Sequence, residues 1–110
     1  MNRNADTRAV IKKIVQRLVS GYPPERIILF GSYAYGQPDA DSDIDLLIIK
    51  ATEERFFDRL HTVRRVTAGT HPHIPIEPIV LTPAEVQERL KAGDQFLSEI
   101  LQRGEVLCAS

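Results

Sequence analysis

Two short, continuous apolar runs constrain the fold of this 110-residue chain more than any other feature. Residues 27–30 (IILF) end at a glycine, and residues 46–49 (LLII) follow the sequence DID. Each run is shorter than a typical helix and lacks the alternation of a strand with one wet face, so both are predicted to be buried strands. The second run is too apolar for a sheet edge, which places it inside a sheet with both faces covered.

Segments with helical patterns flank these strands. The first has apolar residues at helical spacing from Val10 to Val19, with Asp6 or Thr7 as its predicted cap. The second spans residues 53–68, and two sets of side chains are assigned to its faces: Phe56, Phe57, Leu60 and Val63 to the inner face, and Arg55, Arg59, Arg64 and Arg65 to a solvated face. Helices are also predicted over residues 83–92 and 94–103, the former opened by a capping box, TPAE, with proline at its first position.

A third strand is predicted over residues 74–81. Pro75 and Pro78 each remove a donor from it, so it should lie at a sheet edge or begin late. Residues 105–108 add a short last strand, and residues 32–36 form about one helical turn before a polar loop over 37–42. This order predicts an α/β (α+β) fold, a small mixed β-sheet of three to four strands covered by helices, with residues 1–110 as one domain.

Composition narrows the classes of partner. A net charge of −1 and a pI of about 6.3 provide no global basic field, so direct nucleic-acid binding is not expected and any polyanion must be held locally. No apolar run approaches membrane-spanning length and the N-terminus has no signal-peptide core, which favours a cytoplasmic protein without a membrane partner. The single cysteine, Cys108, forms no internal disulfide. The sequence leaves the oligomeric state open.

The pair Asp43 and Asp45 is the first candidate for chemistry. Residues two apart on a strand point to the same face, and two neighbouring carboxylates repel unless a cation lies between them or one takes a proton. Oxygen ligands at a rigid strand end suit Mg²⁺, which relies on waters and substrate phosphates for its other ligands. Gly31 and Ser32 follow the first strand, where glycine permits close approach and free amides attract phosphate. Taken alone, two such aspartates more often cap a turn or form an ion pair at a strand end.

Other residues have plainer explanations. His71 and His73 lie in THPHIP, which lacks a third histidine or a cysteine and is better explained as a loop than as a metal site. The segment starting at Gly31 is no P-loop, because Gln37 and Pro38 stand where lysine and serine or threonine are required. Two questions stay open. Tyr33 and Tyr35 either contact a nucleotide or fill space below the turn, and the apolar residues of the last helix (Phe96, Leu97, Ile100 and Leu101) either close the core or dock a partner.

Gly31-Ser32, ten residues and then Asp43-x-Asp45 resembles the G-S-x(10)-D-x-D signature of the polymerase-β-like nucleotidyltransferases. The flanking stretches SYAYG and SDIDLLI resemble the minimal nucleotidyltransferases of prokaryotes, which commonly act as antitoxin partners of HEPN toxins. The resemblance implies that the Gly31-Ser32 turn holds the β- and γ-phosphates of a nucleoside triphosphate and that Asp43 and Asp45 bind two Mg²⁺ ions. The family's third carboxylate, usually aspartate, helps bind the metal that activates the acceptor hydroxyl, and it falls on Glu77; the alternative is a glutamate that faces solvent from an edge strand. Tyr35 stands where many members have a basic residue.

The same resemblance implies a reaction in which a hydroxyl attacks the α-phosphorus and pyrophosphate leaves. We expect Mg²⁺-dependent transfer of a nucleotidyl group, adenylyl from ATP, to a hydroxyl of a partner protein, with a tyrosine of a HEPN toxin as the implied acceptor. The chain is too short to contain the helical substrate domain of larger relatives, so the acceptor is expected to come from elsewhere. Two alternatives stay open. One is a weak or silent antitoxin that acts by binding, which the departures at Tyr35 and Glu77 favour, and the other is transfer to a small molecule such as an aminoglycoside.

Overall fold

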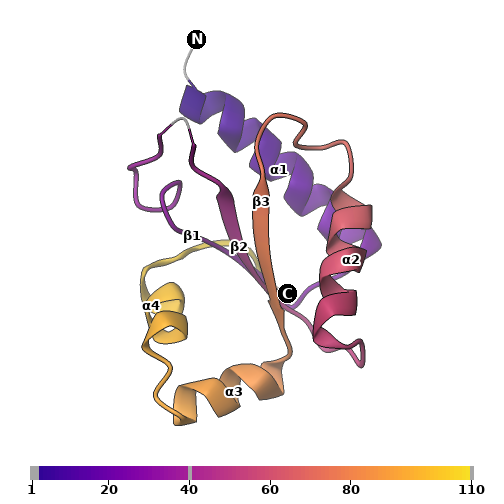
Figure 1. Ribbon diagram of the computed structural model, residues 1–110, viewed down its shortest axis with the longest axis vertical. Helices are drawn as coiled ribbons and strands as arrows, with labels where there is room; N and C mark the ends of the chain where they lie inside the picture. The colour runs from indigo at the N-terminus through magenta and orange to yellow at the C-terminus, as the bar shows by residue number, and fades with distance from the viewer. Residues whose placement is uncertain (1–2, 40, 110) are drawn as a thin grey trace.

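A four-stranded mixed sheet forms the centre of the computed structural model, which describes residues 3–39 and 41–109 (Figure 1). The elements follow in the order α1 (Arg3–Gly21), β1 (Arg26–Phe30), β2 (Ile44–Ile49), α2 (Phe56–Thr67), β3 (Ile76–Leu81), α3 (Pro83–Lys91), α4 (Gln95–Arg103) and β4 (Glu105–Ala109). The strand order is β3-β2-β1-β4. β1 is antiparallel to β2 and β4, and β2 is parallel to β3 through the crossover helix α2. The predicted fold class is confirmed.

Strand positions follow from the apolar runs and the prolines. Leu46, Leu47 and Ile48 of β2 are fully buried, which confirms the interior position of this strand. β3 is an edge strand and begins at Ile76, later than residue 74, as the prolines predict. The pairing nevertheless extends back by one residue, because Pro75 keeps its carbonyl group, which accepts a hydrogen bond from the amide of Ile44 at 2.9 Å.

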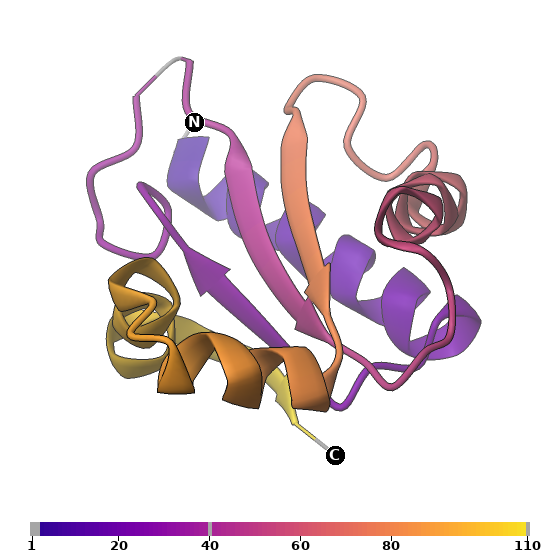
Figure 2. The same ribbon diagram turned by 60° about the horizontal axis from the view of Figure 1, so that its bottom comes forward.

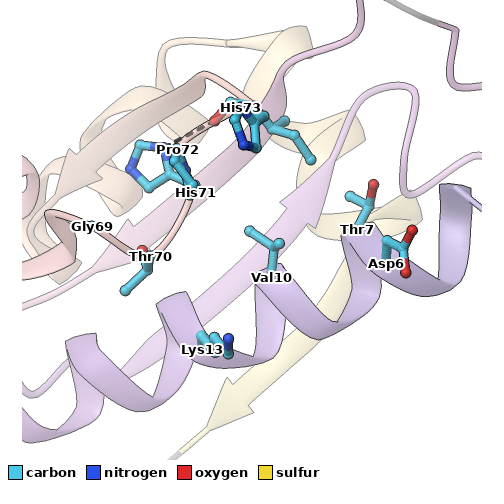
Figure 3. A pocket seen from close by; sticks show the side chains of 10 residues that line it. Asp6, Thr7, Val10, Lys13, Gly69, Thr70, His71, Pro72 and His73 are labelled. Atoms are coloured by element: carbon cyan, nitrogen blue, oxygen red, sulfur yellow. Dashed lines mark hydrogen bonds between the residues drawn. The ribbon is translucent and has the colours of Figure 1, made fainter.

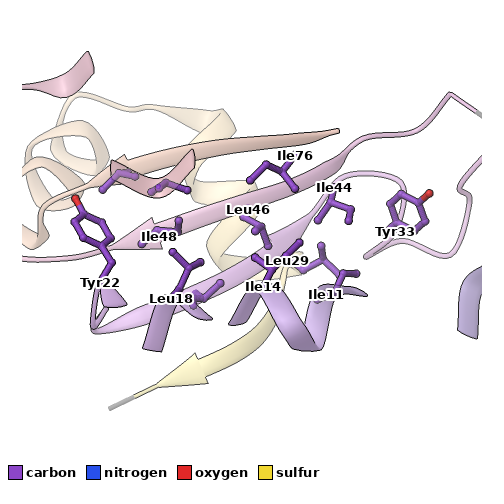
Figure 4. Packing of buried hydrophobic residues seen from close by; sticks show 13 residues of the cluster. Ile11, Ile14, Leu18, Tyr22, Leu29, Tyr33, Ile44, Leu46, Ile48 and Ile76 are labelled. Atoms are coloured by element: carbon purple, nitrogen blue, oxygen red, sulfur yellow. The ribbon is translucent and has the colours of Figure 1, made fainter. Parts of the chain in front are cut away.

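One face of the sheet is covered by α1 and α2. Figure 4 shows this layer, in which side chains of α1 pack against alternate residues of the strands. Its buried members are Ile11, Ile14, Leu18, Tyr22, Ile27, Leu29, Tyr33, Ile44, Leu46, Ile48, Val63, Ile76 and Val80.

The opposite face carries α3 and α4 (Figure 2). The buried cluster there consists of Ile28, Phe30, Leu47, Ile49, Leu81, Val86, Leu97 and Ile100. The last helix therefore closes the core through Leu97 and Ile100, whereas Phe96 is 57% exposed. The capping box before α3 is also confirmed: the Thr82 side chain accepts from the amide of Glu85, whose carboxylate accepts from the amide of Thr82.

The predicted cap of α1 is wrong. The helix already includes Arg3, so Asp6 lies in its first turn, where a negative charge favours the positive end of the helix dipole. Thr7 is buried at 1% exposure and belongs to the helix body. No helix within the described ranges is long and apolar enough to cross a membrane.

The predicted faces of α2 also need correction. Phe56 and Phe57 are 41% and 74% exposed, so neither is buried on the inner face. The buried line consists of Arg59, Val63 and Thr67, which are spaced four apart, and Arg59 therefore does not share the solvated face of the other arginines. Helix geometry explains Phe57, which points away from the buried line. Phe56 lies seven residues before Val63 and so shares its face, but it is the first residue of α2 and stays 41% exposed.

Arg59 can be buried because all its charge and hydrogen-bonding needs are met locally. Its Nε donates to the carbonyl of Glu54 at 2.9 Å, and one terminal nitrogen donates to the carbonyl of Val80 at 3.1 Å. The same nitrogen lies 2.6 Å from Oε1 of Glu85, and the second donates to Oε2 at 3.3 Å. The guanidinium thus ties α2 to the end of β3 and the start of α3.

Candidate active site

The strand topology brings three chain segments together at one end of the sheet. Asp45 lies opposite Phe30, the last residue of β1, and opposite Glu77 near the start of β3. Figures 1 and 2 show that the starts of β2 and β3 and the turn after β1 share this end. The structure therefore places the predicted residues Gly31, Asp45 and Glu77 in one neighbourhood, although Glu77 is remote from the other two in the sequence.

Side-chain direction follows from the alternation along β2. Leu47 and Ile49 pack beneath α3 and α4, so Asp45 points to the same face of the sheet, at the edge of that helical layer. Asp43 directly precedes the strand; both aspartates are half-buried, whereas Glu77 is exposed. The acidic groups thus lie where the helical cover ends.

These carboxylates influence one another. Burial raises the pKa of Asp45 to about 6, and the negative charges of Asp43 and Glu77 contribute to the same shift. Within residues 3–39 and 41–109, no lysine or arginine forms an ion pair with any of the three. The site therefore carries negative charge that a bound cation would neutralise.

The turn after β1 is packed directly against Asp45. Gly31 has a φ of +74°, and a Cβ at this position would collide with Oδ2 of Asp45. The carbonyl of Gly31 accepts from the amides of Ala34 at 3.0 Å and of Tyr35 at 3.1 Å, so the predicted single turn forms. Ser32 is half-buried within it. Glycine is required at position 31 for two reasons: the backbone adopts the left-handed αL conformation, and there is no room for a Cβ beside the carboxylate of Asp45.

A pocket of about 370 Å³ opens beside this turn. Its wall consists of Phe30, Gly31, Tyr35, Asp45, Phe96, Glu99 and Ile100. The two tyrosines of the turn separate here. Tyr33 is 7% exposed and fills space in the core, as Figure 4 shows, whereas Tyr35 lines the pocket.

Sequence reasoning missed the contribution of α4 to this wall. The ring of Phe96 packs edge-on against Phe30, with ring centroids 5.7 Å apart. The guanidinium carbon of Arg103 lies 4.5 Å from the centroid of the Tyr35 ring, and Arg103 is also paired with Glu99 at 2.8 Å. The spacing of Glu99 and Arg103 indicates only a pair on a helix surface. Its position beside Tyr35 depends on tertiary packing and had no local signal.

A second hollow is separate from the carboxylates. It has a volume of about 430 Å³ and lies between α1 and the loop before β3 (Figure 3). Its lining comprises Asp6, Thr7, Val10, Lys13, Gly69, Thr70, His71, Pro72, His73 and Ile74. Nδ1 of His71 lies 2.9 Å from the carbonyl oxygen of Ile74, which shapes this loop. None of the predicted site residues lines it, so the site is assigned to the smaller pocket.

The donors at the candidate site fit a hard cation. Asp43, Asp45 and Glu77 offer only carboxylate oxygens, which Mg²⁺ prefers. In the part of the chain that the structure describes, no three His, Cys, Asp or Glu side chains are gathered into a ligating group. Mg²⁺ commonly uses one or two carboxylates and completes its shell with waters and phosphates, so the pair Asp43 and Asp45 is compatible with such an ion, and Glu77 lies opposite Asp45 on the next strand.

Comparison with known proteins bears on the family and the fold of this chain. Residues 10–106 match the family described as the nucleotidyltransferase domain. A candidate nucleotidyltransferase from Sulfolobus solfataricus is 30% identical, with a TM-score of 0.57 over 80% of this chain and 82% of that one. A toxin–antitoxin structure with AMP-PNP is 21% identical, and a mutant of the toxin–antitoxin MntA-HpeT is 19% identical; each has a TM-score of 0.63 over 90% of this chain and 73% of that one. At these identities the last two show the fold alone. No curated protein matches the sequence.

Proposed function

The chain belongs to the nucleotidyltransferase domain family, and on this basis we propose that it transfers an adenylyl group from ATP to a hydroxyl of a partner protein. One observation carries the proposal: Asp45 packs against the glycine turn at the wall of one pocket, two residues after Asp43 and opposite Glu77 on the neighbouring strand. Metal-assisted attack at phosphorus needs carboxylates for the cation and a small-residue turn for the phosphates, and this pocket combines the two.

Each residue has a defined task in the proposed reaction. Asp43 and Asp45, with Glu77, hold two Mg²⁺ ions, and the Gly31-Ser32 turn binds the β- and γ-phosphates. The bound ions supply charge neutralisation and ease the loss of the acceptor's proton. The acceptor oxygen forms a bond to the α-phosphorus while the bond to the bridging oxygen breaks. Pyrophosphate leaves, and the hydroxyl proton passes to solvent.

We propose a toxin of the HEPN type as the acceptor, modified on a tyrosine. Support comes from the two toxin–antitoxin structures that share this fold, one of which holds the ATP analogue AMP-PNP. Glu77 is exposed and both aspartates are only half-buried, so a protein acceptor has access to the acidic groups.

Label transfer tests the proposal directly. The wild-type protein is incubated with Mg²⁺ and lysate of the source organism, once with ATP labelled at the α-phosphate and once with ATP labelled at the γ-phosphate. Nucleotidyl transfer marks a protein band with the first label and not with the second. The variant carrying both Asp43→Asn and Asp45→Asn should leave the band unlabelled, whereas Asp58→Asn, which changes an exposed carboxylate on α2, should not alter it.

A band labelled equally by the double variant would refute the proposed chemistry. If neither protein labels a band, although the wild type binds ATP, the second candidate function is favoured: an antitoxin that neutralises its toxin by binding. The exposed rings of Phe57 and Phe96 support this alternative, since they offer apolar contact area. Co-expression separates the two functions, because a binding antitoxin still neutralises the toxin when both aspartates are replaced.

A further inference from the structure

The proposed site contains an imbalance of charge. Asp43 and Glu77 act electrostatically on Asp45, and Glu99 lines the same pocket as Asp45. A bound triphosphate brings further negative charge, only part of which Mg²⁺ neutralises. Stable nucleotide binding therefore calls for a cationic group of the protein near the phosphates.

Arg103 is placed to supply this charge. Among the described lysine and arginine residues, it is the one with contacts to two residues of the pocket wall, the Tyr35 ring at 4.5 Å and Glu99 at 2.8 Å. Tyr35 belongs to the same turn as Gly31 and Ser32, because its amide donates to the carbonyl of Gly31. The guanidinium is thus attached, through the aromatic ring, to the turn that is assigned to the phosphates.

We propose that Arg103 is a phosphate-binding residue of this site, and that it leaves Glu99 to contact the terminal phosphates of the nucleotide. The inference rests on the proposed function, since it assumes that a nucleoside triphosphate occupies the pocket. A guanidinium stacked on an aromatic ring keeps its donors free in its own plane, where they match the oxygens of a phosphate in pairs. Stacking on Tyr35 thereby positions the group without using its hydrogen bonds.

The present partner of Arg103 is easily exchanged. The side chains of Arg103 and Glu99 are 59% and 51% exposed, and an ion pair this exposed contributes little to stability. A triphosphate carries more charge than one carboxylate and accepts the same paired hydrogen bonds, so the exchange favours the nucleotide. Glu99 consequently limits affinity, because it both competes for Arg103 and repels the phosphates.

The alternative is that Arg103 only fastens the turn to α4. Isothermal titration with ATP and with AMP, in the presence of Mg²⁺, separates the two roles for the wild type, Arg103→Gln and Arg103→Lys. The matched control is Arg89→Gln on α3, an exposed arginine whose pairing with Asp94 is loose at 3.9 Å and which lies outside the pocket wall. If Arg103 only holds the turn against α4, its replacement should change the affinities for ATP and AMP alike. If Arg103 contacts the terminal phosphates, its replacement should change the affinity for ATP alone.

We expect Arg103→Gln to weaken ATP binding by roughly tenfold, the size of one charge-assisted contact, and to leave AMP binding nearly unchanged. Arg103→Lys should recover part of the loss, Glu99→Gln should tighten ATP binding, and Arg89→Gln should change neither nucleotide. ATP binding by Arg103→Gln at the wild-type level, or equal losses for ATP and AMP, would overturn the inference while the proposed function stands. A wild type that binds no ATP would overturn both.

Discussion

Replacement of Asp45 by asparagine should stabilise the metal-free protein at neutral pH. Burial, together with the charges of Asp43 and Glu77, raises the pKa of the Asp45 carboxyl from 3.8 to about 6. A raised pKa in the folded state means that the ionised carboxylate opposes folding. Below the unfolded pKa the carboxyl is protonated in both states and does not destabilise the fold. As the pH rises from there through about 6, the carboxyl ionises and the free energy of unfolding falls. Asparagine has nearly the same shape and carries no charge.

The magnitude follows from the shift and the surroundings of the side chain. A shift of about two units corresponds to at most about 3 kcal/mol in the free energy of unfolding. Asp45 is only half-buried, and its neighbour Glu77 is exposed, so solvent screens part of the repulsion. We therefore expect Asp45→Asn to raise the free energy of unfolding by about 1–2 kcal/mol above about pH 7, and by almost nothing near pH 4, where the wild-type carboxyl is largely protonated.

Urea unfolding with a chelator present, measured at both pH values, tests this reasoning. Asp58→Asn is the matched control, because it removes an exposed carboxylate on α2, outside the site, and should change stability little at either pH. A lower free energy of unfolding for Asp45→Asn at both pH values would refute the argument, since it would mean that the carboxylate is a structural acceptor. The same gain at both pH values would also contradict it, because the gain could not then come from the charge.

Two further predictions concern residues that the fold holds in special positions. Arg59→Ala should lower the free energy of unfolding by about 3 kcal/mol, because it leaves the Glu85 carboxylate and two backbone carbonyls without their partner. Thermal unfolding of Arg59→Ala and Arg59→Met measures this loss. A change as small as that caused by Arg89→Gln would contradict the prediction. Gly31→Ala should cost about 1–2 kcal/mol from its positive φ alone. The new Cβ should also displace the carboxylate of Asp45, so the variant should lose label transfer even below its unfolding temperature, and full activity would show that this close approach is not needed.

Much of the fold could be predicted because its signals are local. The apolar run of β2 requires a position inside the sheet, whereas the prolines of β3 exclude an interior position for that strand. Thr82 and Glu85 form the capping box that specifies the start of α3. Of the proposed site, the two aspartates and the glycine turn belong to one stretch with fixed spacing. Glu77 could be matched only through the resemblance, and the strand register then brought it opposite Asp45.

The wrong or missing predictions concern side chains whose burial or pairing depends on residues far away in the sequence. An arginine in an amphipathic helix is normally solvated, and Arg59 is buried only because Glu85 and the carbonyl of Val80 lie beside it in the fold. Phe56 and Phe57 look like core residues by hydrophobicity alone, but Phe57 points away from the buried line of α2 and Phe56 is exposed at the first position of the helix. Arg103 reaches Tyr35 only after α4 has packed on the sheet. A single sequence carries no local pattern for such pairs.

The location of the site follows from the topology itself. Because β1 runs antiparallel to β2, the chain leaves β1 at the end where β2 begins, and because α2 carries the chain back to a parallel β3, the start of that strand reaches the same end. The start of the strand places Asp45 at the edge of the helical cover, in a pocket that it shares with Phe96 and Glu99 of α4, while Leu47 and Ile49 of the same strand remain beneath that cover. The charge that destabilises the site is thus confined to the open end of a core that is otherwise apolar. The loss of stability that Asp45→Asn should reverse is therefore local, and it is a consequence of placing a cation site where a phosphate ligand can enter.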